Sequence, residues 1–322
     1  MVDLMRIGFR FPRELPASQA APLALKAEQL GLDEFWVVED CFWAGGIATA
    51  GAALAVTESI TVGIGVLPAV ARNAALTAME LGALAELYPG RFVAGLGHGP
   101  RSWMQQIGEL PPSQLTALEE ILVAVRRLLA GEEVTVTGEQ VNLDQVRLVF
   151  PPAAVPPILA GVRGPKSLAL SGRVADGTIL AEPVTPEYLT FARQAIGAAN
   201  HRLVSYNWLA VDADRDRARE RVRGEVAAML SPNLAPHLRP LPFGAELLSI
   251  IDSVKDQAEL AARLRPEWLD ELAICGPVDR CAARVRELHA AGSESVILLP
   301  VPTETIDPQL AAAAEVAAVA RG

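Results

Sequence analysis

Residues 59–99, SITVGIGVLPAVARNAALTAMELGALAELYPGRFVAGLGHG, decide the fold class that this sequence predicts. Residues 60–66 are apolar and β-branched with interspersed glycines, residues 74–88 are apolar on nearly every helical face, and residues 91–96 are again short and apolar. Two buried strands joined by a helix of about four turns form a βαβ unit, because neighbouring parallel strands need a long crossover. Ligands of parallel sheets bind where the strands end, so the loops after these two strands are the first candidates for a functional site.

Strand and helix patterns alternate along the whole chain, as expected for repeated βαβ units. Eight strands are expected, at residues 5–9, 34–38, 60–66, 91–96, 156–160, 177–181, 203–211 and 295–299. With helices between them and no long linker, they predict a single α/β domain over residues 1–322, a (β/α)8 TIM barrel with insertions. An open doubly wound sheet is the alternative, but its dinucleotide-binding version would carry G-x-G-x-x-G after the first strand, and this sequence does not.

Two segments do not fit the regular repeat. A small hairpin is expected near residues 132–148, and a proline-rich, partly helical insertion is expected near residues 231–268. Helices are expected over residues 243–264 and 276–291. The proline-rich insertion lies between strands seven and eight, so it is the expected lid of the barrel.

Composition and charge limit the possible partners. The 38 acidic residues outnumber the 28 basic ones and the net charge is −10, so neither nucleic acid nor an anionic membrane is an expected partner. The three cysteines, Cys41, Cys275 and Cys281, show no C-x-x-C spacing, so no disulfide framework and no metal site are predicted. Neither a signal peptide nor an apolar run of roughly 18 residues is present. A soluble, cytoplasmic protein with a small-molecule substrate is expected.

Two predicted helices are unusually apolar for the outside of a barrel. Residues 46–57 carry no charged side chain, and residues 74–88 carry only Glu80 and Glu86. The outer helices of a barrel normally show a polar face to water, so these two should be covered. We expect a homodimer that packs through them.

Two acidic residues and one histidine stand at strand ends, where a barrel binds its substrates. Glu39 and Asp40 end the second strand, where burial or mutual repulsion could tune one of them for proton transfer. His98 lies between glycines after the fourth strand, where an imidazole could donate to a ligand carbonyl or shuttle a proton. The alternatives are loop acids that cap the next helix and a hydrogen-bonded structural histidine. Glu39, Asp40 and His98 are the predicted catalytic residues.

Glycines at other strand ends favour a flat or anionic ligand. Gly65 and Val66 end the third strand and would let a planar ring approach the backbone, although simple barrel packing is the alternative. Residues 161–164 form a glycine loop before a helix that starts at Pro165. The free N–H groups at the start of this helix and the nearby cations could together bind a phosphate, and an ordinary charged loop is the alternative. The predicted cofactor-binding residues are Gly65, Val66, Gly97, Gly161, Val162, Arg163, Gly164, Lys166 and Ser167.

Several segments carry a family resemblance. They are MRIGF at residues 5–9, LGLDEFWVVED at 30–40, the whole of residues 59–99, and PPILAGVRGPKSLALSGRVADGTIL at 156–180. Through them the sequence resembles the luciferase-like monooxygenase superfamily and, within it, the oxidoreductases that use the deazaflavin coenzyme F420, such as the methylenetetrahydromethanopterin reductases. Motifs of hydrolases and metalloenzymes, such as G-x-S-x-G and H-E-x-x-H, are not found.

The resemblance implies a barrel that binds a flavin or deazaflavin at its C-terminal mouth, usually as a dimer. The family's non-proline cis peptide after strand three maps to Gly65 and Val66, whose bulge backs the central ring of the cofactor. Its phosphate contacts map to residues 161–167, in agreement with the anion site expected there.

Two positions depart from the family pattern. Related deazaflavin enzymes often have Asp-His where this chain has Glu39 and Asp40, and the sugar-phosphate dehydrogenases have an acid where it has Pro100, so the sugar-phosphate reaction is not expected. The leading prediction is an oxidoreductase that transfers hydride between F420 and an unidentified small organic substrate, such as a pterin-like compound or a C=C or C=N acceptor. The alternatives are an FMN-dependent monooxygenase of the same fold and a non-catalytic barrel that binds a flavin or deazaflavin.

Overall fold

A closed barrel of eight parallel strands forms the centre of the protein, in a computed structural model that describes residues 5–322. Each strand pairs in parallel with the next one along the barrel wall, and the last strand returns to the first, so the predicted (β/α)8 fold is confirmed. The barrel strands are β1 (Arg6–Arg10), β2 (Glu34–Val37), β3 (Thr61–Pro68), β4 (Phe92–Gly97), β7 (Ile158–Gly161), β8 (Gly177–Leu180), β9 (Arg202–Val211) and β11 (Ser295–Leu299).

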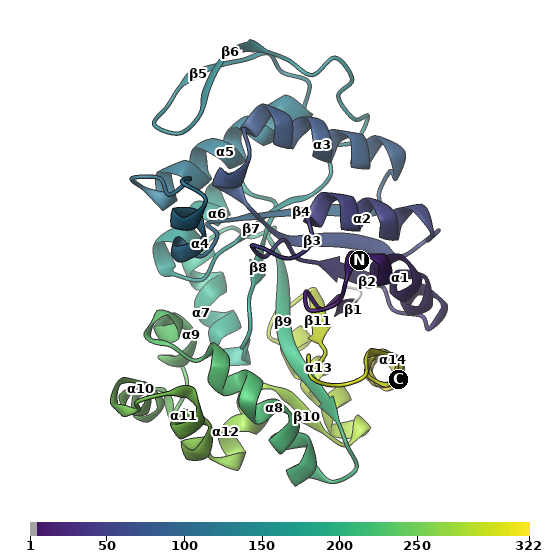
Figure 1. The fold of residues 1–322 in the computed structure, drawn as a ribbon, viewed down its shortest axis with the longest axis vertical. Helices are drawn as coiled ribbons and strands as arrows, with labels where there is room; N and C mark the ends of the chain where they lie inside the picture. Colours follow the sequence, from purple (N-terminus) through teal and green to yellow (C-terminus); the bar gives the residue numbers. More distant parts are fainter. Residues whose placement is uncertain (1–4) are drawn as a thin grey trace.

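Helices cover the outside of the barrel (Figure 1). Several of them begin at a capping side chain. The Asn73 carboxamide accepts from the Ala75 amide at the start of α3, and the Ser113 hydroxyl accepts from the Thr116 amide at the start of α5. The helices of the repeat are α1 (Ala20–Gln29), α2 (Gly46–Ala55), α3 (Ala74–Leu87), α5 (Gln114–Leu129), α6 (Pro165–Val174), α7 (Pro186–Ile196), α8 (Arg215–Met229), α13 (Val278–Ala290) and α14 (Ile306–Arg321). Among residues 5–322, no helix has both the length and the apolar character needed to cross a membrane.

Two insertions leave the barrel at different places. The strands β5 (Val134–Thr137) and β6 (Asn142–Val146) pair as an antiparallel hairpin, which lies beyond α3 and α5 in Figure 1. The proline-rich insertion follows α8 and holds a short 3-10 turn (Pro232–Leu234) and four helices, and it packs against α8 at the other end of the molecule. These helices are α9 (Ala235–Leu238), α10 (Gly244–Ser253), α11 (Gln257–Arg263) and α12 (Pro266–Leu272).

The sequence analysis misplaced part of this region. The single helix expected over residues 243–264 is wrong, because α10 ends at Ser253 and Asp256 starts a new helix by accepting from the Glu259 amide at 2.9 Å. The helix expected from residue 276 begins at Val278, since the preceding residues form a short strand beside β9, β10 (Ile274–Gly276). This strand, α12 and the short helix α4 (Arg101–Gln106) were not predicted.

A buried polar network closes the N-terminal end of the barrel. The Glu34 carboxylate is fully buried and accepts from the Arg202 guanidinium at 2.5 Å, the Trp36 indole at 2.7 Å and the Ser295 hydroxyl at 2.9 Å. These donors compensate a charge that would otherwise be costly to bury. The Trp36 ring fits inside the barrel because Gly63 has no side chain; a Cβ there would lie 2.4 Å from the indole. Among residues 5–322, these side chains therefore fill the N-terminal end of the barrel.

Candidate functional site

The ends of β3, β4 and β7 meet around the side chain of Val66. A Cβ at Gly161 would lie 2.3 Å from Val66 Cγ1, and a Cβ at Gly97 would lie 2.8 Å from Val66 Cγ2. Both distances are too short for any side chain, so Val66 packs directly on the two glycine backbones. The Gly65–Val66 peptide bond is cis, at a place where β3 shifts its register against β4. The structure thus brings four predicted cofactor residues together in one surface, which we call the bulge surface: Gly65, Val66, Gly97 and Gly161.

Tyr206 of β9 reaches across the barrel and supports the bulge surface from inside. A Cβ at Gly65 would lie 2.2 Å from the Tyr206 hydroxyl oxygen, and the phenol ring meets Trp36 edge-on with ring centroids 5.9 Å apart. This hydroxyl is buried and has no hydrogen-bond partner among residues 5–322. Burial raises the pKa of Tyr206 well above its usual value, so the phenol stays neutral. The sequence analysis missed Tyr206, since no local pattern marks a strand residue that contacts the opposite wall.

The loop before α6 presents unpaired backbone donors. Gly164 is the N-cap residue and Pro165 is the first helical residue, so the N–H groups of Lys166 and Ser167 have no partner within the helix. A Cβ at Gly164 would meet nothing within 4 Å, which leaves space above the helix start. The Lys166 side chain is exposed and Arg163 is half-buried on the same loop. Free amides, open space and two cations fit a phosphate group.

His98 lies between β4 and this loop, and both of its ring nitrogens are occupied. Nδ1 is 3.0 Å from the Gln114 carbonyl oxygen, and Nε2 is 3.0 Å from the Ser167 hydroxyl oxygen. A carbonyl can only accept, so Nδ1 carries the hydrogen and the neutral ring accepts from Ser167 at Nε2. Burial lowers the pKa of His98, which favours this neutral form. The structure therefore joins His98 to the predicted phosphate loop.

Glu39 caps the helix that follows it, which was the alternative to a catalytic role. Its carboxylate accepts from the backbone N–H of Gly46 at 2.9 Å, at the start of α2, and from Arg72, whose Nη2 lies 2.8 Å away. A second guanidinium nitrogen of Arg72 contacts the other carboxylate oxygen. This bidentate pair anchors α2 to the segment after β3.

Asp40 follows β2 directly after Glu39 and pairs with a different arginine. Its carboxylate accepts from Arg13 Nη1 at 2.5 Å, and 28% of its side chain is exposed. The Arg13 guanidinium also stacks over the Trp43 ring, 4.4 Å from its centroid. The two adjacent carboxylates therefore have separate partners, and the Asp40 side chain is the more exposed of the two, since that of Glu39 is 11% exposed.

The opposite wall holds two residues that the sequence analysis missed, Arg10 and Glu182, beside Trp208. Arg10 ends β1, and its Nη1 lies 3.5 Å from the carboxylate of Glu182, which follows β8. The Arg10 guanidinium carbon is 5.4 Å from the ring centroid of Trp208 on β9. Arg10 Nε and the Trp208 indole N–H are buried without a partner among residues 5–322, as expected for groups that await a polar ligand or water. The rule that barrel sites lie at strand ends would have found Arg10 and Glu182.

The proline-rich insertion contacts α7 and the segment before it through His237. Its imidazole stacks on Tyr188 with centroids 3.7 Å apart, and its Nδ1 lies 2.8 Å from the Pro183 carbonyl oxygen. Tyr188 in turn donates to the Arg163 carbonyl oxygen at 2.9 Å. Burial, helped by the charge of Arg163, lowers the pKa of His237 to about 3. The insertion is thus linked, through Tyr188, to the loop that precedes α6.

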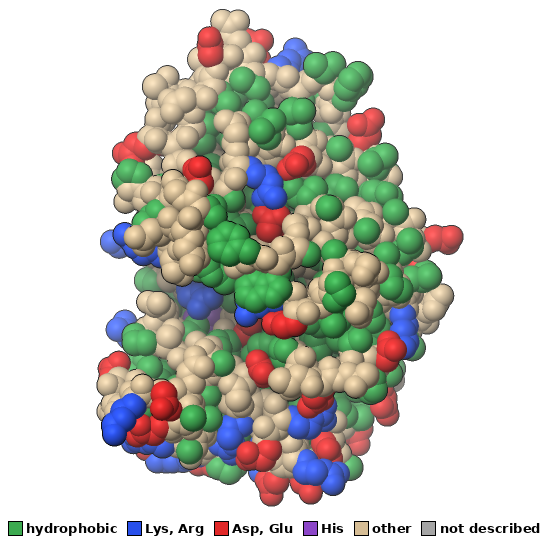
Figure 2. Space-filling model, in the orientation of Figure 1, with side chains coloured by type: hydrophobic (Ala, Val, Ile, Leu, Met, Phe, Trp, Pro, Cys, Tyr) green, Lys and Arg blue, Asp and Glu red, His purple; other side chains and the backbone are tan. Residues whose placement is uncertain are grey.

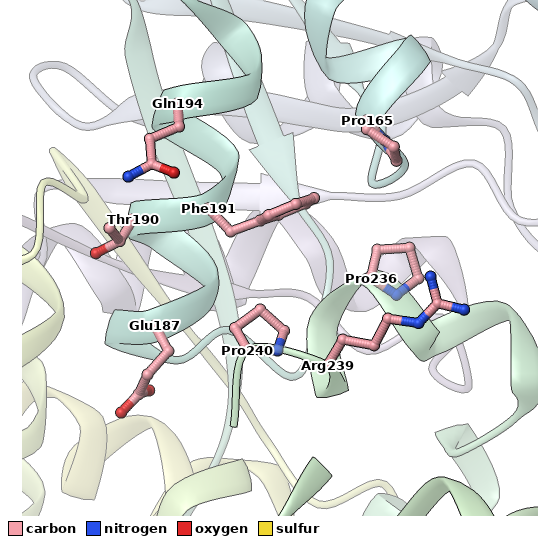
Figure 3. Close-up of a pocket in the computed structure, with 8 residues that line it drawn as sticks. All are labelled: Pro165, Glu187, Thr190, Phe191, Gln194, Pro236, Arg239 and Pro240. Carbon is pink, nitrogen blue, oxygen red and sulfur yellow. The ribbon is translucent and has the colours of Figure 1, made fainter. Parts of the chain in front are cut away.

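A groove of about 630 Å³ lies beside this contact, between α7, α9 and the start of α6. Figure 3 shows the Phe191 ring pointing into it from α7, with prolines around it and charged side chains at its edge. Its lining residues are Pro165, Glu187, Thr190, Phe191, Gln194, Pro236, Arg239 and Pro240. Figure 2 shows a hollow between the upper and lower parts of the molecule in which Lys or Arg and His side chains are visible.

The described part of the chain contains no disulfide and no cluster of metal-binding side chains. Among residues 5–322, no group of three or more His, Cys, Asp or Glu side chains is placed to hold a metal ion. Cys41, Cys275 and Cys281 are free thiols. Burial raises the pKa of Cys275 to about 11, so this thiol stays protonated near neutral pH.

Comparison with known proteins identifies the family of this chain. A family model described as luciferase-like monooxygenase matches residues 5–295. The chain belongs to the luciferase-like monooxygenase family. Within this family, 5,10-methylenetetrahydromethanopterin reductase of Methanolobus tindarius is 28% identical over 305 residues, which cover 91% of this chain and 93% of the relative.

Two further members of the family are similar over most of the chain. The F420-dependent glucose-6-phosphate dehydrogenase of Nakamurella multipartita is 31% identical over 251 residues, which cover 71% of this chain and 74% of that protein. The solved structure of the coenzyme F420 dependent tetrahydromethanopterin reductase from Methanopyrus kandleri superimposes with a TM-score of 0.80 at 20% identity, covering 97% of this chain and 96% of that one. This superposition shows that the two proteins share their fold.

Proposed function

We propose that this luciferase-like protein is an oxidoreductase that transfers hydride between coenzyme F420 and a small organic substrate. The observation that carries the proposal is the bulge surface beside the open start of α6. A flat ring can lie on the bulge surface, and a phosphate can bind at the start of α6. The relatives named for F420 favour the deazaflavin over FMN.

The chain's own residues fit such a cofactor. Gly65 and Val66 would back the ring, and the glycines at 97 and 161 keep the wall behind Val66 flat. Around the phosphate, the amides of Lys166 and Ser167 and the cations of Arg163 and Lys166 would supply donors, with Val162 and Gly164 completing the loop. When bound, F420 supplies a ring that carries two electrons as hydride, so the protein has to position the reactants and exclude water.

The proposed substrate side is the wall opposite the bulge surface. Arg10 offers hydrogen-bond donors, Glu182 offers an acceptor, and Trp208 offers an apolar face. Asp40 is the proposed proton-transfer group, because its carboxylate is accessible at the rim while Arg13 keeps it oriented. Glu39 is engaged by Arg72 and α2, so its proposed contribution is to hold the rim in place.

The proposal is tested by binding and by turnover. The purified protein is titrated with F420 and with FMN while tryptophan fluorescence is recorded, and reduced F420 is then mixed anaerobically with imine, enone and pterin-like acceptors. We expect F420 to bind more tightly than FMN and to lose hydride to at least one class of acceptor. Turnover that requires FMNH2 and oxygen would instead indicate a monooxygenase, and F420 binding without any hydride transfer would indicate a non-catalytic protein.

We also propose that the protein forms a homodimer through α2 and α3. Leu76, Met79 and Leu87 of α3 are 55%, 56% and 67% exposed, and Val56 at the end of α2 is 42% exposed. Hydrophobic side chains gather over these helices in Figure 2. Isolated exposed apolar residues are ordinary, but a group of this size on helices with few charges is typical of an interface.

A further inference from the structure

The His98–Ser167 pair has a property that the proposed function does not use. Because the Gln114 carbonyl fixes the hydrogen on Nδ1, the lone pair at Nε2 accepts the hydroxyl hydrogen of Ser167. Ser167 therefore presents its oxygen lone pairs, without a hydrogen, to the space above the start of α6. In this arrangement Ser167 repels an anion there instead of donating to it.

A phosphate at the start of α6 would reverse this arrangement. The Ser167 hydroxyl can turn toward the phosphate and donate its hydrogen, which is favourable because hydrogen bonds to charged groups are the stronger ones. Nε2 of the half-buried imidazole would then lose its partner. If Nε2 takes up a proton, it can donate to the Ser167 oxygen, and the chain of bonds from His98 through Ser167 to the phosphate is complete.

The surroundings of His98 allow this change of charge. Burial lowers the pKa of His98 and the Gln114 carbonyl raises it in part, and no ionised side chain contributes to the shift. A phosphate anion would add an attraction that the ring now lacks and would raise its pKa. The charged residues on the surrounding elements are Arg101 on α4 and Glu109 after it, Glu119, Glu120, Arg126 and Arg127 on α5, Arg163 before α6, and Lys166 and Arg173 on α6.

The acids among these residues are engaged or turned outward. Glu119 pairs with Arg173 at 3.1 Å, Glu120 accepts from the backbone amides of the hairpin turn, and Glu109 is exposed. Lys166 is exposed as well. No nearby acid is therefore placed to raise the pKa of His98, so a bound phosphate would be the anion that acts on the imidazole.

We propose that His98 is a positioning residue whose Nε2 takes up one proton from solution when the phosphate of the cofactor binds, so that Ser167 can donate its hydroxyl hydrogen to that phosphate. The inference rests on the proposed function, because it needs F420 at the start of α6. Affinity for F420 should be highest at low pH and should fall as the pH rises from the free-state pKa of His98 to its bound-state pKa. One linked proton changes Kd by up to about tenfold per pH unit in this interval.

The test is calorimetric titration of F420 into the full-length protein between pH 5.5 and 8, in two buffers with different ionisation enthalpies. The dependence of the observed heat on the buffer gives the number of protons taken up. His98→Gln is the matched variant, because its carboxamide can either accept from or donate to Ser167 but does not titrate. Ser167→Ala is the second variant, which breaks the link without altering the imidazole. Protons exchanged by F420 itself are common to all three proteins and cancel in the comparison.

We expect the wild type to take up as much as one proton more than either variant, and its Kd to rise with pH more steeply than theirs. His98→Gln should bind F420 with little loss at high pH, whereas a purely structural role would weaken binding equally at every pH. Equal proton uptake by the three proteins would overturn the inference and leave the proposed function intact. If the wild type does not bind F420 at any pH, both are refuted.

Discussion

Replacing Gly161 with alanine should misplace the surface that backs the cofactor ring. The new Cβ would lie 2.3 Å from Val66 Cγ1, whereas carbon atoms pack at about 3.5–4.0 Å. Val66 must therefore move by about 1.2 Å, the difference between 2.3 Å and the shorter packing distance. It cannot move toward β4, because Gly97 already touches its other methyl group. The bulge surface itself must shift.

The expected losses follow from that displacement. A misplacement of about 1 Å in a positioned reactant costs about 100-fold in rate, and an overpacked site costs about 1–3 kcal/mol in stability. F420 affinity is measured by fluorescence, hydride transfer by the absorbance of the coenzyme, and the free energy of unfolding by urea titration. The control is Gly224→Ala on the exposed side of α8, where a Cβ meets nothing within 4 Å. This control should keep the rate and gain about 0.5–1 kcal/mol in stability.

A double substitution tests whether the loss in Gly161→Ala comes from the contact between the new Cβ and Val66. Val66→Ala removes the Cγ1 methyl group that clashes with the new Cβ, so Val66→Ala combined with Gly161→Ala should recover most of the lost stability. The coupling between the two sites should reach about 1 kcal/mol or more. The reasoning is refuted if Gly161→Ala behaves like Gly224→Ala, or if the double variant is no more stable than Gly161→Ala alone.

Three further predictions concern the rim, the insertion and the outer helices. Asp40→Asn should slow hydride transfer about 100-fold without changing F420 affinity. Glu39→Gln should instead lower the free energy of unfolding by about 2 kcal/mol, because Arg72 loses its carboxylate partner. A rate loss in Glu39→Gln and a stability loss in Asp40→Asn, from rate and urea measurements, would contradict the proposed roles. His237 has a pKa of about 3 in the folded protein, against about 6.5 when unfolded. Below about pH 6.5 the unfolded chain therefore binds a proton at His237 that the folded chain does not bind, so this group lowers the free energy of unfolding by about 2 kcal/mol between pH 7 and pH 5. His237→Phe should remove that part of the pH dependence in urea titrations. An unchanged pH dependence in the variant would contradict this role of His237. Leu76→Glu with Met79→Glu should convert a dimer to a monomer in analytical ultracentrifugation, whereas Ile107→Glu, at an exposed isoleucine at the end of α4, should not change the mass. A dimer that survives the paired substitution must use another surface.

Local sequence patterns predicted the barrel because each of its strands is a short, buried, apolar run. Glycines at strand ends marked the close backbone approach at the bulge surface, and they also predicted a phosphate site in the loop before α6, which stays a prediction. Tyr206 and Trp36 could not be predicted as supports of the bulge, because their contact with Gly65 joins strands that are distant in the sequence.

The partners of charged residues were equally hidden from local patterns. Arg72 lies 33 residues from Glu39, and Asp40 pairs with Arg13 from an earlier loop. Sequence alone shows two adjacent acids, and only the fold gives them different partners. The break between α10 and α11 was missed because one capping aspartate, Asp256, interrupts an otherwise helical pattern.

The Glu34 network fills the N-terminal end of the barrel among residues 5–322. Under the proposed function, F420 and its substrate therefore enter from the same end, with the F420 ring on the bulge surface and the substrate on the opposite wall. Each ligand then narrows the space through which the other enters and leaves, so an analogue bound on the substrate side should slow the exchange of F420.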